Sequence, residues 1–406
     1  MDRIVVVGAS LAGLWTCESL RAGGYAGTIA LVGAELHQPY DRPPLSKAFL
    51  KGDWEPERIR LRKPGELDRL GLDLRLGATA VALDVPTRTV TLESGEMLAA
   101  DGVVIATGSA PRRLPNQPDI DGVTMLRTLD DSLDLRRRLA DGPRVVVIGA
   151  GFIGLEVAAT AAQAGCAVTV LEGAPAPMVR GLGAEMGEVV ARVHERHGVD
   201  VRCGAHIVGI DGDGARVTGV RLSDGEVVGA DLVVVGIGVS PATEWLEGSG
   251  LELRDGVVCD DSLRAAPGIY AAGDCARWIN NLFGQAGEEM RVEHWTNAAE
   301  QGSAAASNLL AELAGGPSTP YAPVPFFWSD QFDSRIQFVG RAHGEDDVRV
   351  VGGDPDGSFI AIYGHEGRFR GVLGVNMPKP VMRMRKLLGA RASWADAISH
   401  AATVAQ

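Results

Sequence analysis

The sequence predicts an α/β fold, because one unit of strand, glycine-rich turn, helix and second strand occurs twice along the chain. In both copies a run of β-branched residues leads directly into the glycines, and a helical pattern follows. The strands lie over residues 4–7, 28–32, 144–148 and 167–171, and the turns over residues 8–13 and 149–154. Because the two units are too far apart to be halves of one domain, we expect two Rossmann-type nucleotide-binding domains.

Length and composition indicate a folded protein of two or three domains. A chain of 406 residues exceeds the roughly 250 to 300 residues at which single cores stop growing. Its 46% apolar and 22% charged residues are typical of globular proteins, and its 53 glycines indicate many tight turns. The formal net charge of −13 opposes binding to nucleic acid, so we expect no nucleic-acid partner.

The cysteines exclude several classes of metal and redox site. They are Cys17, Cys166, Cys203, Cys259 and Cys275, and no two are close enough for a CxxC pair. We therefore expect no zinc ribbon, no iron–sulfur ligand set, no redox dithiol and no other metal site. Their odd number fits a reducing cytoplasm better than a secreted framework. A strand begins at residue 4 and no apolar run reaches about 20 residues, so we expect neither a signal peptide nor a membrane span.

Three further apolar runs end in glycine and predict buried parallel strands. They lie over residues 103–108, 233–238 and 269–274. Each would deliver its carboxyl end to a ligand crevice. Proline- and glycine-rich linkers lie at residues 111–118 and 315–320. From Tyr321 onward, short strands and then a basic helix near Lys379 predict a C-terminal α+β domain. These strands are expected over residues 335–339, 359–363 and 371–375.

The second glycine turn carries the stronger nucleotide signal. Gly149 permits the tight turn, Gly151 lets the backbone approach a pyrophosphate, and Gly154 lets the helix pack on the strand. Glu172 ends the next strand, where a carboxylate binds the adenine ribose hydroxyls. A carboxylate there repels the extra phosphate of NADPH, and no arginine follows in residues 173–175. We therefore expect NADH rather than NADPH.

The first turn is less regular. Ser10 replaces the middle glycine between Gly8 and Gly13, where a small side chain can be tolerated. Glu35 follows the second strand as a ribose-binding acid or, since the position before it is alanine, as a solvated loop charge. Asp274 either binds a ribityl chain or pyrophosphate, or caps a helix. Two sites in one chain suggest a permanently held FAD and a dissociable NADH.

Several short motifs succeed one another along essentially the whole chain. They are residues 8–13, 41–47, 106–108, 149–156, 238–241, 272–274 and 293–295. In this order they resemble the FAD-dependent ferredoxin reductases of bacterial oxygenase systems, in the glutathione-reductase-like superfamily. The resemblance implies a discontinuous FAD-binding domain, an inserted NAD-binding domain and a C-terminal α+β domain. Their expected bounds are residues 1–111 with 239–318, 112–238 and 319–406.

The resemblance also implies which residues contact each cofactor. For FAD they are Gly8, Ser10, Leu11, Ala12, Gly13, Glu35, Arg42, Lys47, Val81, Ala106, Thr107, Gly108, Arg112, Asp274, His294 and Trp295. For NAD they are Gly149, Gly151, Phe152, Ile153, Gly154, Glu156, Glu172 and Gly238. Lys47 and Glu156 form the implied catalytic pair beside the reactive flavin nitrogen. A lysine partner would offset the poor solvation of Glu156. Alternatively, Glu156 is an exposed acid that favours a helix N-terminus.

The resemblance further implies that reduced flavin discharges directly to an external acceptor. Residues 43–47, which carry a reactive cysteine in disulfide reductases and peroxidases, contain none here, and we expect Cys17 to lie in the core. A helix starting at His294 and Trp295 would point at the flavin. Trp328 fits the acceptor side and a domain-interface core equally well. The implied docking residues are Arg291, Trp328, Arg335, Lys379, Arg383, Arg385 and Lys386.

The function that the resemblance implies is an NADH-dependent ferredoxin reductase. It would pass single electrons to a two-iron two-sulfur ferredoxin that serves a haem-thiolate monooxygenase or a ring-hydroxylating dioxygenase. The basic helix would then dock an acidic ferredoxin, although a solvated helix face and a membrane-surface helix remain open. Two other functions also remain open. They are an NADH oxidase or quinone reductase, and an NADH-responsive flavoprotein like apoptosis-inducing factor.

Overall fold

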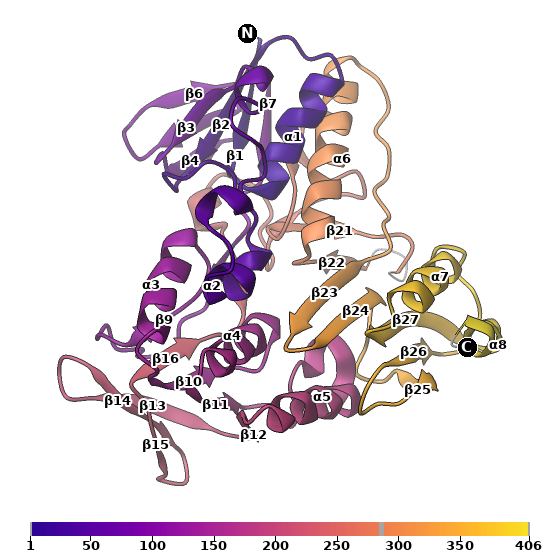
Figure 1. Cartoon of the computed structure of the whole chain (residues 1–406). Helices are drawn as coiled ribbons and strands as arrows, with labels where there is room; N and C mark the ends of the chain where they lie inside the picture. The colour runs from indigo at the N-terminus through magenta and orange to yellow at the C-terminus, as the bar shows by residue number, and fades with distance from the viewer. Residues whose placement is uncertain (1, 284–287, 405–406) are drawn as a thin grey trace. The chain divides into compact units, whose positions relative to one another are not determined.

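The computed structural model describes residues 2–283 and 288–404. Its contacts divide the chain into two compact units, whose elements Figure 1 labels. Unit 1 comprises Met1–Asp41, Glu57–Ala110 and Ser240–Pro325, and unit 2 comprises Arg42–Pro56, Pro111–Val239 and Phe326–Gln406. Strands β8 (Ser109–Pro111) and β17 (Val239–Pro241) lie where the chain passes from one unit to the other. The division into three domains that the sequence suggests stays a prediction.

Unit 1 is built on a six-stranded sheet in the order β19-β20-β7-β1-β2-β3. All neighbouring pairs are parallel except β19 and β20. The strands are β1 (Arg3–Val7), β2 (Thr28–Gly33), β3 (Asp73–Leu76), β7 (Gly102–Ile105), β19 (Arg264–Ala266) and β20 (Ile269–Ala271). The central strands are buried on both faces, which explains their continuous apolar sequences. Because β1, β7 and β20 are parallel, the segments that come after them lie at one edge of the sheet.

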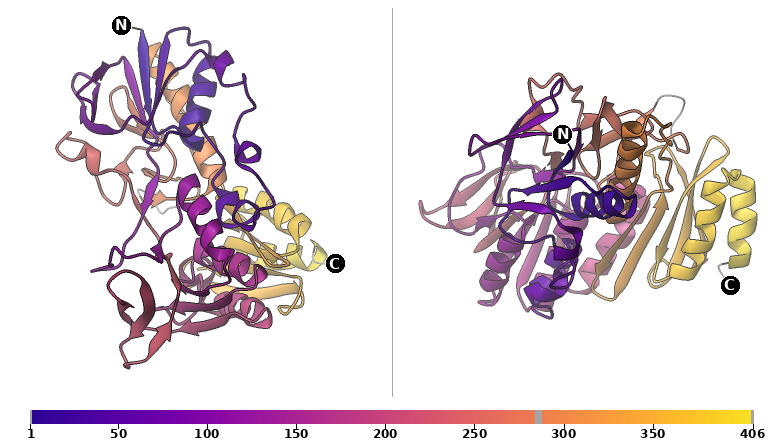
Figure 2. Two further views of the ribbon diagram at one scale, coloured as in Figure 1. Left: turned by 60° about the vertical axis from the view of Figure 1, so that its left-hand side comes forward. Right: turned by 90° about the horizontal axis from the view of Figure 1, so that it is seen from above.

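Helices α1 (Leu11–Ala22) and α6 (Trp295–Leu313) lie side by side in unit 1 (Figures 1 and 2). They approach so closely at Gly302 that an added Cβ would lie 2.4 Å from the carbonyl oxygen of Ala12. The Thr16 hydroxyl lies 2.8 Å from the carbonyl oxygen of Ala12 and 3.2 Å from that of Gly302. Backbone therefore meets backbone at this contact, and only glycine fits position 302 without a shift.

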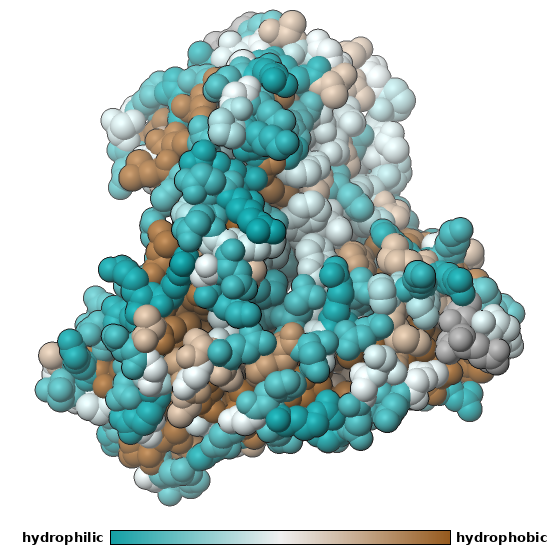
Figure 3. Space-filling model, viewed as in Figure 1, coloured by the Kyte–Doolittle hydropathy of each residue, from teal (hydrophilic) through white to brown (hydrophobic). Residues whose placement is uncertain are grey.

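Two smaller sheets complete unit 1, in the orders β4-β5-β6 and β18-β21-β22. Their strands are β4 (Ala80–Asp84), β5 (Thr89–Leu92), β6 (Met97–Ala99), β18 (Val257–Val258), β21 (Ala276–Ile279) and β22 (Glu289–Arg291). Short 3-10 helices lie at Pro56–Ile59, Asp68–Leu70 and Glu244–Leu246. Figure 3 shows hydrophobic atoms where Figure 1 labels β4 and β6, and the exposed side chains of Val81 and Met97 lie on these two strands.

The first sheet of unit 2 is parallel throughout, in the order β12-β11-β10-β16-β9. Its strands are β9 (Val123–Thr124), β10 (Arg144–Ile148), β11 (Ala167–Glu172), β12 (Asp200–Cys203) and β16 (Leu232–Val235). Helices α3 (Leu129–Leu139), α4 (Phe152–Gln163) and α5 (Val179–Arg196) accompany it, with a hairpin sheet of β13 (Ile207–Gly212), β14 (Val217–Leu222) and β15 (Val227–Gly229). The segment η1 (Pro43–Ser46) and α2 (Ala48–Lys51) contacts α3 and α4.

The C-terminal part of unit 2 is an antiparallel sheet in the order β23-β24-β27-β26-β25. The strands are β23 (Phe326–Gln331), β24 (Ser334–Gly340), β25 (Asp347–Gly353), β26 (Phe359–His365) and β27 (Arg368–Val375). Helices α7 (Pro378–Gly389) and α8 (Trp394–Val404) lie side by side (Figure 2), and α7 packs on β24 and β27. Strand β23 contacts α4, so this sheet adjoins the parallel one within unit 2.

The structure confirms the α/β class and the C-terminal α+β region. Each strand predicted around the two glycine turns is present, and the basic helix near Lys379 is α7. The elements not predicted from the sequence include helices α3, α5 and α8, strands β23 and β25, and strands β3 to β6 and β12 to β15. Among the described residues, no helix combines the length and the apolar character needed to cross a bilayer.

We expect Gly302→Ala to destabilise the protein, although alanine is the better helix former by about 1 kcal/mol. The new methyl would collide with the backbone of α1, and overpacking of this kind costs about 1–3 kcal/mol. Thermal unfolding measures the effect, with Ser303→Ala at the next position of α6 as the matched control. A Gly302→Ala protein that melts at or above the control would contradict the close contact.

Candidate functional site

The glycine turn of unit 1 has no room for side chains at its first and last glycines. Gly8 has φ of +122°, and its added Cβ would lie 2.0 Å from the carbonyl oxygen of Ala106. A Cβ on Gly13 would lie 1.9 Å from the carbonyl oxygen of Gly8. Ser10 is the N-cap of α1 and its side chain makes no capping hydrogen bond. The Ser10 side chain therefore does not cap the first N–H groups of α1. A helix that binds a phosphate requires such N–H groups as donors.

The predicted acid Glu35 lies two positions beyond β2 and is half-buried. The Tyr40 hydroxyl donates a hydrogen bond to its Oε2 atom at 2.5 Å. The carboxylate is therefore held in a defined place rather than free in solvent. Its ribose-binding role stays a prediction.

The turn at Gly273 and Asp274 is held from several sides. The Ser109 hydroxyl donates to Asp274 Oδ2 at 2.7 Å, and Gln301 Oε1 accepts a hydrogen bond from the Gly273 N–H at 2.8 Å. Arg291 Nη1 donates to the carbonyl oxygen of Asp274 at 3.1 Å. The alternative of a helix N-cap is wrong, because the element after Asp274 is the strand β21. These contacts fix the side chain of Asp274 at the same sheet edge as the glycine turn.

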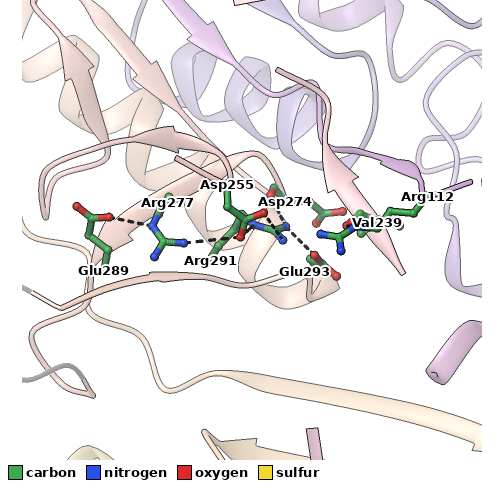
Figure 4. Close-up of polar contacts among 8 residues, drawn as sticks. All are labelled: Arg112, Val239, Asp255, Asp274, Arg277, Glu289, Arg291 and Glu293. Atoms are coloured by element: carbon green, nitrogen blue, oxygen red, sulfur yellow. Dashed lines mark hydrogen bonds and ion pairs between the residues drawn. The ribbon is translucent and has the colours of Figure 1, made fainter. Parts of the chain in front are cut away.

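Arg291 lies inside a chain of alternating charges (Figure 4). Its side chain is only 9% exposed and pairs with Asp255 at 3.2 Å and Glu293 at 2.6 Å. Arg277 extends the chain by pairing with Asp255 and Glu289. These contacts favour support of the Asp274 turn over contact with a partner. Little of the Arg291 side chain is therefore exposed to contact a docking partner, as the implied role would require.

Helix α6 begins at Trp295 with His294 as its N-cap, as the sequence suggests. Loss of water around the imidazole lowers the pKa of His294 to about 4, although Asp274 opposes this shift. The Trp295 indole donates to Asp41 Oδ1 at 2.6 Å and meets Trp15 edge to face at 5.8 Å. A neutral imidazole and an anchored indole thus mark the start of α6.

The remaining residues implied for FAD fall in both units. In unit 1, Thr107 Oγ1 donates to the Ala242 carbonyl at 2.7 Å, and Val81 is 44% exposed. In unit 2, Arg42 Nη1 donates to the Arg127 carbonyl at 2.6 Å. Arg112 Nε donates to the Val239 carbonyl at 2.9 Å, as Figure 4 also shows. Leu11, Ala12, Ala106 and Gly108 lie in or beside the glycine turn and the segment after β7.

The glycine turn of unit 2 repeats this geometry. A Cβ on Gly149, whose φ is +100°, would lie 2.4 Å from the carbonyl oxygen of Gly236. A Cβ on Gly154 would lie 2.2 Å from the carbonyl oxygen of Gly149, whereas one on Gly151 would meet nothing within 4 Å. Gly151 is also the N-cap of α4 and offers no side-chain cap. The middle glycine thus borders open space, as expected where a pyrophosphate approaches the backbone.

Glu172 lies at the end of β11 and contacts the same turn. Its carboxylate accepts hydrogen bonds from the Ala150 N–H at 2.6 Å and the Ala174 N–H at 2.8 Å. Glu172 therefore stabilises the loop and also lies at the position predicted to bind the adenine ribose.

The other residues implied for NAD differ in exposure. Phe152 packs on Phe327 at 4.6 Å, Ile153 is 39% exposed, and Gly238 has a positive φ with open space around it.

Lys47 and Glu156 form a buried ion pair in unit 2. The Lys47 Nζ atom lies 2.7 Å from Glu156 Oε2, and the carboxylate side chain is 6% exposed. The Ser46 hydroxyl donates to the same oxygen at 2.5 Å. The alternative of an exposed Glu156 is therefore wrong. The segment before α2 is itself anchored, because Thr160 Oγ1 donates to the Ser46 carbonyl at 2.8 Å.

The basic face of α7 is directed to solvent. Its apolar residues Val381, Met384 and Leu388 are buried and pack on the C-terminal sheet, whereas Met382 is 43% exposed and Leu387 is half-buried. Lys379, Arg383 and Lys386 are exposed and Arg385 is half-buried. Trp328 stacks on Phe326 at 5.9 Å, and Arg335 is 53% exposed. The predicted docking residues on α7 thus form a cationic surface.

Four side chains around Glu156 were not singled out from the sequence. They are Ser46, Ser329, Gln331 and His194. A signal was available for two of them, because Ser329 and Gln331 are polar residues on one face of a strand otherwise rich in aromatic residues. His194 comes from a distant helix and carried no local signal.

All five cysteines are free, and Cys17 is buried in the core as expected. Loss of water raises the pKa of every one of these thiols above its ordinary value. In the described part of the chain, no group of three His, Cys, Asp or Glu residues is placed to hold a metal ion.

Comparison with known proteins places these features in one family. Residues 2–302 match the model described as pyridine nucleotide-disulphide oxidoreductase, and residues 326–404 match the one described as reductase C-terminal. The chain is 39% identical to rhodocoxin reductase of Rhodococcus erythropolis, over 95% of this chain and 89% of that protein.

Two solved structures cover nearly all of the chain. The structure of the covalent putidaredoxin reductase–putidaredoxin complex matches with a TM-score of 0.90 at 33% identity, over 100% of this chain and 99% of the other. The ferredoxin reductase for the CYP199A2 system from Rhodopseudomonas palustris matches with a TM-score of 0.91 at 37% identity, over 99% and 100%. The two glycine turns, the sheet that carries each, and these matches lead to one conclusion: the chain belongs to the pyridine nucleotide-disulphide oxidoreductase family.

Proposed function

We propose that this chain is an FAD-containing, NADH-dependent ferredoxin reductase. Two observations on this chain carry the proposal. It contains two glycine turns with the backbone geometry of dinucleotide-binding turns, and it has no cysteine in residues 43–47. In place of a cysteine this segment carries Lys47, which forms an ion pair with Glu156. Relatives named as ferredoxin or putidaredoxin reductases support the same conclusion.

The residues present in unit 1 fit FAD. The Gly8–Gly13 turn and the uncapped start of α1 offer backbone N–H groups to a pyrophosphate, and Asp274 and Glu35 offer carboxylates to hydroxyl groups. The N-terminus of α6, which is the positive end of the helix dipole, would stabilise the negative charge that the flavin ring gains on reduction. The further FAD contacts that we propose are the other residues that the family resemblance implied, among them Val81 of unit 1 and Arg42, Lys47 and Arg112 of unit 2.

In the proposed mechanism the turn of unit 2 binds NADH. The Gly149–Gly154 turn would take the pyrophosphate, and Glu172 would take the adenine ribose. FAD, when bound, would supply the chemistry of accepting one hydride, which carries two electrons, and of releasing those two electrons one at a time. Lys47 and Glu156 would orient the reacting rings and exclude water, since both are largely buried and bonded to each other.

The proposed acceptor is a two-iron two-sulfur ferredoxin that serves a haem-thiolate monooxygenase or a ring-hydroxylating dioxygenase. The cationic surface of α7, formed by Lys379, Arg383, Arg385 and Lys386, would attract an acidic carrier over a long range. Trp328 and Arg335 are the proposed contacts outside α7. Location in the cytoplasm stays a prediction.

Turnover with different acceptors tests the function. We expect NADH to reduce the flavin rapidly and cytochrome c slowly, with a large acceleration when a two-iron ferredoxin is added. Equal rates with and without ferredoxin, combined with fast reduction of oxygen or quinone, would favour an oxidase or quinone reductase. Fast flavin reduction with no efficient acceptor would favour an NADH-responsive flavoprotein.

We expect Glu172→Arg to shift preference from NADH toward NADPH. The change removes a carboxylate that repels the extra phosphate and adds a cation that attracts it. The ratio of kcat/KM values for the two coenzymes should change by about tenfold or more, equivalent to about 1.4 kcal/mol. Glu188→Arg on the exposed face of α5 is the control for the change in net charge. An unchanged ratio would exclude Glu172 from the ribose site.

We expect Lys47→Met to slow reduction of the flavin by NADH more than it weakens NADH binding. The variant keeps the hydrocarbon stem but leaves the buried Glu156 without its cation, a loss that costs about 3–5 kcal/mol in comparable pairs. Stopped-flow rates at several NADH concentrations separate the two effects. Lys51→Met, which removes an exposed lysine of α2, should behave as the wild type. Equal rates for both variants would rule out the catalytic role.

Reversal of Arg383 and Arg385 to glutamate should raise the KM for ferredoxin at low ionic strength. The effect should shrink as salt screens the surface charges, and ferricyanide reduction should not change. The control is reversal of Arg137 and Arg216, whose side chains are both 77% exposed in unit 2. A similar rise in both double variants would show a general charge effect and no docking site on α7.

A further inference from the structure

A line of buried polar side chains leads to the Oε1 atom of Glu156, whereas Lys47 contacts its Oε2 atom. Ser329 Oγ lies 2.6 Å from Glu156 Oε1, and Gln331 Nε2 lies 3.0 Å from Ser329 Oγ. Gln331 Oε1 lies 2.9 Å from His194 Nε2. The four residues belong to unit 2 and come from α4, β23 and α5. Of these four residues, the proposed function uses only Glu156.

The hydrogen bonds in this line all run in one direction. The carboxylate of Glu156 accepts, so the Ser329 hydroxyl must donate to it. The Ser329 oxygen then accepts from the amide N–H₂ of Gln331, which turns the amide oxygen toward His194. That oxygen can only accept, so the proton of the imidazole lies on Nε2. Each donor thus points toward Glu156, and such chains strengthen one another in a low-dielectric interior.

The surroundings leave these groups no alternative partner. Ser329 and His194 are 0% exposed and Gln331 is 1% exposed. Within the described structure, His194 Nδ1 is buried and has no hydrogen-bond partner, which fits a nitrogen that carries no proton. Burial lowers the pKa of His194 to about 4, so the ring is neutral near pH 7. A neutral ring with its proton on Nε2 is the form that the line requires.

Strand β23 separates this line from the predicted acceptor side. Alternate residues of a strand face opposite ways, so Ser329 and Gln331 share one face while Trp328 and Asp330 share the other. Ser329 and Gln331 are buried, whereas Trp328 and Asp330 are only half-buried. The polar pair on the buried face is therefore not part of the docking surface and requires another explanation.

We propose that Ser329 and Gln331, backed by His194, are positioning residues that fix the Glu156 carboxylate so that its Oε2 atom stays on Lys47. The inference rests on the proposed function, in which the Lys47–Glu156 pair orients the reacting rings. With Oε1 bound to Ser329 and Oε2 bound to Ser46 and Lys47, the carboxylate cannot rotate without losing a donor. Loss of the line would leave a buried oxygen unsatisfied and the pair less well oriented.

The test compares Ser329→Ala and Gln331→Met with the wild-type holoenzyme. Ser329→Ala removes the donor to Glu156, and Gln331→Met removes the donor to Ser329 while keeping similar volume. The control is Ser262→Ala, which removes another buried hydroxyl that contacts a carboxylate, that of Asp260. Thermal unfolding and the visible flavin spectrum establish that each variant is folded and loaded.

Two measurements are made on each protein. Stopped-flow reduction by NADH should be about tenfold slower in Ser329→Ala and less affected in Gln331→Met, with the Kd for NADH within about twofold of wild type in both. The infrared carboxylate band of Glu156, identified by its loss in Glu156→Gln, should move in both variants and stay unchanged in Ser262→Ala. This band reports the hydrogen bonds without any turnover.

The outcomes separate the inference from the function on which it rests. A shifted band together with slower reduction at nearly constant Kd supports the positioning role. A wild type that NADH reduces normally, with variants equal to it in rate and band position, overturns the positioning role and leaves the proposed function intact. A wild type that NADH does not reduce overturns the proposed function itself, whatever the band does. If Ser329→Ala does not fold, Gln331→Met decides by the same two measurements.

Discussion

A carboxylate taken out of water is stable only when donors replace the lost water, and Ser46, Lys47 and Ser329 of unit 2 supply those donors to Glu156. Three segments far apart in sequence meet there: the segment before α2 with Ser46 and Lys47, helix α4, and strand β23 with Ser329. The first segment is held by Thr160 of α4, which binds the Ser46 carbonyl. The geometry of the ion pair therefore depends on how these three segments pack against one another.

The two glycine turns have the same backbone geometry but different surroundings. At Gly8 and Gly149 the chain passes so near a neighbouring strand end that no side chain fits. The acidic residues near the two turns differ in their contacts, because Asp274 is fixed at the sheet edge of unit 1 whereas Glu172 binds the loop in unit 2. One repeated scaffold thus presents two sites of different chemistry, which suits a protein that joins a tightly held cofactor to an exchangeable one.

The features predictable from the sequence are those decided by neighbouring residues. The strands around the glycine turns, the turns themselves and the starts of α1 and α4 follow from local patterns, whereas the resemblance supplied the start of α6 and the Lys47–Glu156 pairing. The contact of His194 with Gln331 joins residues 137 positions apart and leaves no local trace. Arg291 looks like a surface charge in the sequence, because Asp255, 36 positions away, meets it only after folding.

The protonation state of the cysteine thiols affects how readily hydrogen peroxide can oxidise the protein. Reduced flavins that meet oxygen release hydrogen peroxide, which attacks thiolates far faster than protonated thiols. Burial raises the pKa of the thiols of Cys17, Cys259 and Cys275 and so keeps them protonated. Loss of water also raises the pKa of Cys203, and nearby acids such as Glu172 add to that shift. The protein therefore offers peroxide few reactive thiolates, so peroxide formed by leakage of electrons to air should oxidise these cysteines only slowly.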